Sequence, residues 1–329
     1  MIRLGGELLE VDVVAEVDTS RGPLPVHVIA LGNPDPAVPA FGMFGGVHGI
    51  ERIGSLVAIA CLRNVIVRMR WDVAMRRMLE STRLVFMPIV NPGGLLKGTR
   101  ANPRGVDLMR NAPLQCDERT PPLLGGQRLS PRLPWYRGAA GAPMEAESRA
   151  LCDVVERELA SHRFALAVDC HSGFGLEDRI WFPYAHTREP GPHLPELLAL
   201  CELFDDAHPQ HRYVFEPQSR QYLAHGDLWD FVYRSACEHD ERVLLPLTLE
   251  MGSWIWVKKN PLQLLSIDGL FNPIIAHRRR RVLRRHAVLI DFLMRAAAGE
   301  SAWRPAPGDR SGLRERALAR WYGTGRGTR

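Results

Sequence analysis

The stretch AFGMFGGVHGIERIGSLVAIACLRNVIVRM (residues 40–69) joins two apolar segments through a glycine-rich turn. Residues 40–47 have the continuous apolarity of a buried strand, and residues 51–69 have the length and apolar density of a helix packed on a sheet. Between them Gly45, Gly46 and Gly49 allow a tight turn, so the side chains of His48 and Glu51 can converge on one point. A buried strand that runs directly into such a helix favours an α/β fold.

Strands and helices alternate along the rest of the chain. Apolar patterns predict strands at 23–31, 83–90, 164–171, 179–184 and 243–250. Helical periodicity predicts helices at 144–161, near 194–207, near 227–237 and at about 273–297. This alternation indicates a sheet with helices on both faces, whose function lies where the C-terminal ends of the strands open onto loops. Residues 91–143 have no sustained period, and a loop of that length is usually functional or disordered.

The composition is that of an ordinary soluble globular protein. Of the 329 residues, 46% are hydrophobic and 24% are charged. The first residues carry Glu7, Glu10 and Asp12 without a continuous apolar run, so we expect neither a signal peptide nor a membrane anchor. The six cysteines form no CxxC pair, which argues against a zinc ribbon or a thioredoxin-like site. We therefore expect a reducing, cytoplasmic setting.

The net charge of +5 comes from the C-terminal part of the chain. Residues 278–285 read RRRRVLRR, and residues 299–329 hold seven arginines against three acidic residues, so the remainder is net negative. Ile275, Val282, Leu289 and Leu293 recur at helical spacing, which places the arginines on the solvent face of a packed helix; an anionic partner is the alternative. We expect a single catalytic domain at 1–298 and a basic, loosely structured tail at 299–329.

Three polar clusters stand at the ends of predicted buried strands. They are HGIE (48–51), DCHS (169–172) and EMG (250–252). His171 could reach His48 and Glu51 from a neighbouring strand end. Two histidine nitrogens and one carboxylate, with a fourth position left for water, make up a catalytic zinc site. The alternative is that these histidines only cap their strands.

The three clusters belong to a longer ordered set of motifs. HGIE (48–51), NPGGLLKGTRANPRGVDLMRN (91–111), DCHS (169–172), YLAHGDLWDF (222–231) and LTLEMG (247–252) occur in the order seen in zinc metallocarboxypeptidases. The chain thus resembles the carboxypeptidase A-like superfamily, in its bacterial-type, non-secreted branch. The resemblance implies an α/β fold with a mixed, twisted β-sheet flanked by helices on both faces, and one zinc ion per chain.

The resemblance also implies a role for each residue of the site. It makes His48, Glu51 and His171 the zinc ligands, with Asp107 orienting a ligand histidine. It makes Glu250 the general base and Arg100 the arginine that stabilises the oxyanion. It makes Arg110 the arginine that binds the substrate carboxylate and Tyr222 a mobile active-site tyrosine. These roles suit the chemistry, because a carboxylate can move the proton of an activated water and a guanidinium can stabilise developing negative charge.

Two positions depart from the family pattern. Met109 stands before Arg110 where the family usually has asparagine, which removes one donor to the substrate carboxylate. Trp229 stands where the family usually shapes its side-chain pocket, and its bulk suggests a small or unusual pocket. HExxH, G-x-S-x-G, P-loop and GxGxxG motifs are absent from the sequence.

We therefore expect a zinc metallopeptidase that hydrolyses a peptide or amide bond next to a carboxylate-bearing residue. One alternative is a deacylase of small N-acyl amino acids, as in the aspartoacylase and succinylglutamate desuccinylase branch. The other is a non-catalytic binding protein that uses the basic C-terminal helix. The expected partner is a peptide or small amide substrate, with no membrane and no nucleic acid. The oligomeric state stays open.

Overall fold

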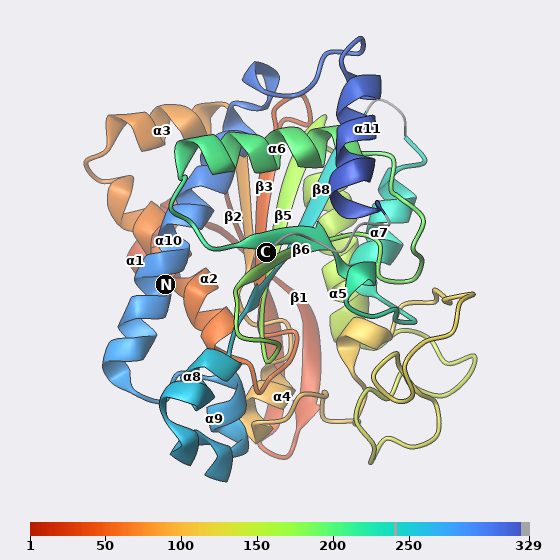
Figure 1. Cartoon of the computed structure of the whole chain (residues 1–329). Helices are drawn as coiled ribbons and strands as arrows, with labels where there is room; N and C mark the ends of the chain where they lie inside the picture. The colour runs from red at the N-terminus through yellow and green to blue at the C-terminus, as the bar shows by residue number, and fades with distance from the viewer. Residues whose placement is uncertain (240–241, 324–329) are drawn as a thin grey trace.

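One mixed sheet forms the centre of the protein. The computed structural model describes residues 1–239 and 242–323, and its eight-stranded sheet has the order β1-β2-β4-β3-β5-β8-β6-β7 (Figure 1). Neighbours β4, β3, β5 and β8 are parallel, whereas the pairs β1/β2, β2/β4 and β8/β6 are antiparallel. The strands are β1 (Glu10–Thr19), β2 (Gly22–Gly32), β3 (Ala40–Gly45), β4 (Arg83–Met87), β5 (Phe164–Ser172), β6 (Arg179–Phe182), β7 (Val214–Pro217) and β8 (Val243–Met251).

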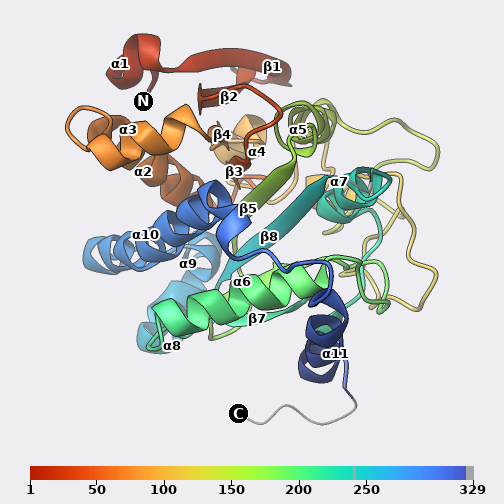
Figure 2. The ribbon, with the colours of Figure 1, turned by 90° about the horizontal axis from the view of Figure 1, so that it is seen from above.

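Helices cover both faces of this sheet, as Figure 2 shows from above. Alternate side chains of β5 divide between two cores: Leu166 and Val168 belong to one, and Ala165 and Ala167 to the other. The first core is closed by α2 (Arg52–Arg68), α3 (Val73–Glu80), α6 (Leu194–Ala207), α10 (Ala276–Ala298) and α11 (Arg310–Trp321). The second is closed by α5 (Ala146–Val155) and α7 (Leu228–Ala236). The expected α/β fold, with a mixed sheet and helices on both faces, is confirmed.

The remaining elements are short. They are α1 (Ile2–Gly5), α4 (Pro92–Lys97), α8 (Trp254–Lys259), α9 (Ile267–Phe271) and brief helical turns that include η2 (Leu108–Arg110) and η5 (Pro261–Leu265). Apart from α4 and η2, residues 91–143 are irregular, as the sequence predicts. Among the described residues, no helix combines the length and the apolarity needed to cross a bilayer.

The sequence patterns miss the two outermost strands. β1 is an edge strand whose residues are mostly exposed, so it lacks the alternation of a half-buried strand. β7, at the opposite edge, has only four residues and pairs in parallel with β6. Hydrogen bonds to the neighbouring strand hold β1 and β7 in the sheet. Their own residues show little alternation of apolar and polar side chains.

The expectation of a loosely structured tail is wrong for residues 310–321, because α11 packs against α6. Ala317 and Trp321 are buried in the first core, and the Trp321 indole donates to the carbonyl of Phe215 at 2.8 Å. Arg310, Arg316 and Arg320 of α11 form ion pairs with Glu196, Glu202 and Asp205 of α6. The sequence hides this helix because only a narrow apolar stripe interrupts its polar residues.

We expect Trp321→Ala to lower the free energy of unfolding by about 3–5 kcal/mol, since it removes a buried aromatic side chain and leaves a cavity. Chemical denaturation followed by circular dichroism measures this difference. Arg316→Ala is the control, because its ion pair lies in solvent and such pairs contribute at most about 1 kcal/mol. Equal and small effects of both substitutions would show that α11 does not stabilise the fold.

Candidate metal centre and active site

The three polar clusters meet at one edge of the sheet because their strands are parallel neighbours. β3, β5 and β8 lie side by side, so their C-terminal ends reach the same edge. His48 and Glu51 lie in the turn from β3 to α2, and Gly46 adopts a φ of 65° there, a conformation that glycine favours. His171 of β5 is the register partner of Glu250 of β8.

His48, Glu51 and His171 form a compact buried cluster. One ligand atom from each residue lies within 4.8 Å of the other two. The Nδ1 atoms of His48 and His171 are 3.2 Å apart, and they lie 2.9 and 3.1 Å from the two Glu51 carboxylate oxygens. The exposed fraction of each of the three residues is 4% or less. This is a set of ligand types and positions that suits zinc.

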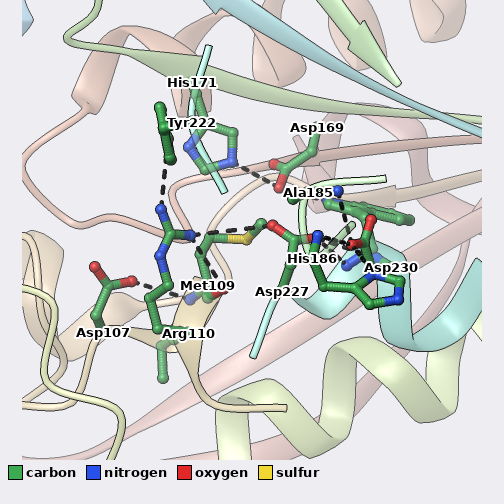
Figure 3. A network of polar contacts seen from close by, with 12 residues as sticks. Asp107, Met109, Arg110, Asp169, His171, Ala185, His186, Tyr222, Asp227 and Asp230 are labelled. Carbon is green, nitrogen blue, oxygen red and sulfur yellow. Dashed lines mark hydrogen bonds and ion pairs between the residues drawn. The ribbon is translucent and has the colours of Figure 1, made fainter. Parts of the chain in front are cut away.

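A carboxylate holds the outer nitrogen of each histidine. Nε2 of His48 lies 3.1 Å from Asp107. Nε2 of His171 lies 2.7 Å from Asp169 (Figure 3). A proton on each Nε2 would then leave both Nδ1 atoms with lone pairs that face each other and Glu51. Such an arrangement is repulsive until a positive charge enters it. The residues therefore fit a cation.

The close approach of carboxylates and histidines also shifts the pKa values of the cluster. Burial alone would lower the pKa of His171, but Asp169 and Glu51 beside it outweigh burial and raise that pKa. Burial would raise the pKa of Glu51, yet His48 and His171 hold it well below its usual value. The carboxylates thus stabilise a positive charge within the cluster, and either a proton or a metal cation can supply it.

Arg100 lies at the edge of the cluster. Its Nε donates to Asp107 at 2.8 Å and its Nη1 donates to Glu51 at 3.3 Å. Burial alone would lower the pKa of Arg100, but the two carboxylates outweigh burial and raise that pKa above its ordinary value. The guanidinium is therefore a fixed positive charge beside the metal ligands. The Arg100 side chain stays 26% exposed, so it borders the open part of the site.

Glu250 of β8 lines a cavity next to the metal-ligand cluster. This cavity has a volume of about 190 Å³. Its walls also include His48, Glu51, Arg100, Arg110, His171 and Tyr222. One oxygen of Glu250 accepts from the backbone N–H of Phe174 at 3.0 Å. Burial, and next the negative charge of Glu51, raise the pKa of Glu250 to about 8. Glu250 therefore lies next to the metal ligands without belonging to their cluster.

Arg110 forms another wall of the cavity, together with Tyr222. The Arg110 side chain is 2% exposed, and its Nη2 donates to the Tyr222 hydroxyl at 3.4 Å (Figure 3). Asp227 approaches Arg110 only to 4.0 Å. Burial raises the pKa of Asp227 to about 7, and the negative charge of Asp230 contributes to this shift. Asp227 thus neutralises Arg110 incompletely near neutral pH, so a buried positive charge faces the cavity. Met109 lines the cavity beside it.

Trp229 does not shape this cavity, contrary to what its place in the sequence suggests. It is buried in the second core, packs edge-to-face on Phe44 at 5.0 Å, and donates to Asp169 at 2.8 Å. The indole therefore positions the carboxylate that holds His171. The small volume of the cavity comes instead from aromatic side chains that sequence reasoning missed, including Trp135, Phe174 and Trp181.

Asp169 is a further residue whose role sequence reasoning missed. It precedes His171 by two positions on β5, and residues two apart on a strand point to the same face. That spacing is a signal that could have paired them. Cys170, between them, points to the opposite face and is buried in the first core.

A mixed sheet with two histidines and a glutamate at the ends of its strands defines the class of zinc-dependent hydrolases with a carboxypeptidase-like fold. The family model described as Peptidase_M14, zinc carboxypeptidase, matches residues 13–254. The chain belongs to this family and is a zinc metallopeptidase. No curated protein sequence gives a significant match.

Several solved structures, carboxypeptidases among them, have a similar fold. The thrombin-activatable fibrinolysis inhibitor (TAFI) matches with a TM-score of 0.67 and 17% identity over 90% of this chain and 71% of that chain. Carboxypeptidase A from Helicoverpa armigera matches with a TM-score of 0.64 and 16% identity over 92% of this chain and 71% of that chain. A metallocarboxypeptidase from Burkholderia cenocepacia matches with a TM-score of 0.54 and 13% identity over 88% of this chain and 65% of that chain.

The family uses zinc, and the cluster of His48, Glu51 and His171 fits that ion. The expected cofactor and the expected class of enzyme are confirmed. The structure brings the predicted site residues to the wall of one cavity, except Asp107, which lies behind His48, and Trp229, which is buried in the second core.

Proposed function

We propose that the protein hydrolyses a peptide or amide bond next to a carboxylate-bearing residue. The observation that carries this proposal is the shared cavity, where Glu250 and the metal ligands stand with the buried positive charge of Arg110. A buried guanidinium without a close carboxylate is costly unless an anion joins it. A substrate carboxylate at Arg110 would meet that need and orient the neighbouring bond towards the metal ligands.

Several polar residues of the cavity have a role in this reaction. His48, Glu51 and His171 would hold the zinc ion, which would lower the pKa of a water to about 7 and polarise the substrate carbonyl. A cation at the ligand cluster would lower the pKa of Glu250 and keep it ionised. Glu250 keeps one oxygen on the Phe174 amide, and the other takes the proton of the water and passes it to the leaving amine. Arg100 is held by Asp107 and Glu51, and its positive charge stabilises the oxyanion. Tyr222, with its hydroxyl at Arg110, adds a hydrogen bond to the substrate.

Met109 affects how tightly the substrate carboxylate is bound. Met109, beside Arg110, cannot donate a hydrogen bond, so the carboxylate is held by fewer donors than an asparagine at this position would allow. We therefore propose weaker and more tolerant carboxylate recognition. Small N-acyl amino acids also carry a carboxylate next to an amide bond and form the second group of substrates to test.

We expect Arg110→Ala to lower kcat/KM by about 10- to 100-fold for peptides with a free C-terminus, because it removes a charge-assisted hydrogen bond. Amidated peptides should lose little. Met109→Asn should improve hydrolysis of the free-carboxylate peptides. Steady-state kinetics on paired free and amidated peptides, and on N-acyl amino acids, measures these differences.

Two further variants separate recognition from folding. Arg110→Lys keeps the positive charge but loses the planar fork, so its loss should be intermediate. Arg104→Ala removes an exposed arginine from the same loop and should change nothing. If the intact protein cleaves free and amidated peptides equally and Arg110→Ala changes neither, the proposed carboxylate recognition is wrong.

We further propose that the protein works in a reducing compartment such as the cytoplasm. Its six cysteines are all free thiols in the structure, and four of them are buried. Free buried thiols are usual in such a setting, whereas proteins in oxidising compartments usually pair their cysteines. A version of the protein tagged for fluorescence microscopy and cell fractionation tests this location.

A further inference from the structure

Two adjoining cavities lie along α10, apart from the metal centre. The first, of about 730 Å³, lies between α10, the end of α6 and residues 208–213. The second, of about 450 Å³, lies between α10 and α8. In Figure 1, α10 runs from the α8–α9 segment towards α6. Arg212, Arg281 and Arg285 line both cavities, and no residue of the metal-centre cavity lines either one.

The walls of these cavities are strongly basic. Arg212, Lys259, Arg278, Arg281 and Arg285 line them and are together called the arginine groove here. Among the described residues, Glu177 is the one acidic residue that lines either cavity, and it already pairs with Arg179 at 3.5 Å. Within residues 1–239 and 242–323, neither Arg212 nor Arg281 has a carboxylate within 4.0 Å. The positive charge of the groove is therefore largely uncompensated.

The packing of α10 does not explain this charge. The helix buries its apolar face through Val282, Leu289 and Leu293, as its sequence period predicts, and its arginines stay outside the core. Arg281 and Arg285 are four residues apart on one helix face, where like charges destabilise a helix. An anion bound between them would turn this repulsion into attraction.

Arg285 and Arg278 are held in place by the surrounding structure. Arg285 lies 2.9 Å from the buried carboxylate of Asp178, and its Cζ lies 5.7 Å from the centre of the Tyr213 ring. Arg278 donates to the backbone carbonyls of Trp256 and Lys259 at 3.2 Å each. Guanidinium groups fixed in this way lose little conformational entropy when a ligand binds.

We propose that the arginine groove binds a ligand that carries several phosphate groups. The planar fork of a guanidinium matches a phosphate with two parallel hydrogen bonds. Arg278, Arg281 and Arg285 follow one helix face over two turns. Arg212 lines the first cavity together with Arg281 and Arg285, and the second together with all three, so the charges can contact more than one phosphate. A soluble polyphosphate compound or a phosphoinositide headgroup would supply this chemistry.

The test compares two double variants of the zinc-loaded, full-length protein. Arg212→Ala/Arg281→Ala removes two groove arginines, both exposed and without a carboxylate partner in the described structure. Arg279→Ala/Arg284→Ala removes the same charge from the same helix, but these two arginines line neither cavity. Arg285 is left intact because Asp178, its partner, also accepts from the backbone of Gly252, two residues after Glu250. Circular dichroism melting checks that both variants fold.

Isothermal titration calorimetry with tripolyphosphate and with ATP measures binding of soluble ligands. Sedimentation with phosphatidylcholine vesicles, with and without phosphatidylinositol bisphosphate, measures binding of the headgroup. We expect the groove variant to bind at least about tenfold more weakly than the intact protein, and the control variant to change by less than about twofold. Binding of the soluble probes identifies a free compound as the source, and binding of the bisphosphate vesicles alone identifies a lipid.

Three outcomes would overturn the proposal. The intact protein could bind none of the probes. Both double variants could lose binding equally, which would show nonspecific attraction to the net charge. Finally, Arg110→Ala could abolish binding while the groove variant keeps it, which would place the anion in the metal-centre cavity.

Discussion

Glu250→Gln is expected to lower kcat by at least about 10²-fold and to leave the zinc content unchanged. Glutamine has the shape of glutamate and can still accept a hydrogen bond from the Phe174 amide, so the strand end should keep its structure. It cannot take up a proton from water at neutral pH. Because Glu250 stands outside the metal-ligand cluster, the metal should stay bound. Steady-state kinetics and metal analysis of the same preparation measure both quantities.

A matched control is Glu189→Gln, which removes an exposed carboxylate from a loop outside the cavity. It should leave both turnover and zinc content unchanged. Near-normal turnover in Glu250→Gln would show that another group moves the proton. Loss of zinc from that variant would instead make Glu250 a ligand and would overturn the division of roles proposed above.

His171→Ala is expected to release zinc and to abolish hydrolysis. The substitution removes one of three ligands and leaves Asp169 without its imidazole partner, so only His48 and Glu51 of the cluster remain. The intact protein should hold about one zinc per chain, and the variant should hold much less after dialysis. Metal analysis by mass spectrometry, together with the activity after zinc is restored, measures the effect.

Asp169→Asn is the graded companion of that variant. Loss of a carboxylate that holds a ligand histidine typically weakens metal affinity by about 10- to 100-fold, so zinc should bind but dissociate more readily. His239→Ala, at an exposed position, should change neither metal content nor activity. Full zinc retention in a His48→Ala/His171→Ala double variant would rule out the assigned metal site.

Local sequence determined the α/β character and the place of the site. The run of residues 40–69 shows a strand, a glycine turn and a helix in order, and each of these depends mainly on side chains close in sequence. His48, Glu51, His171 and Glu250 could be grouped because parallel neighbouring strands end at one edge of a sheet. Their likeness to a known family then predicted zinc and a metallopeptidase, and both are confirmed.

Only the tertiary structure decided which side chains meet across long separations in sequence. Trp229 turns away from the cavity to hold Asp169, and α11 buries Trp321 against Phe215, although local periodicity indicates neither contact. The charge of Arg110 likewise depends on how near Asp227 comes, and the arginine groove exists because Arg212 faces α10. Local patterns encode the direction in which a side chain points, whereas its partner and its burial depend on how distant segments pack.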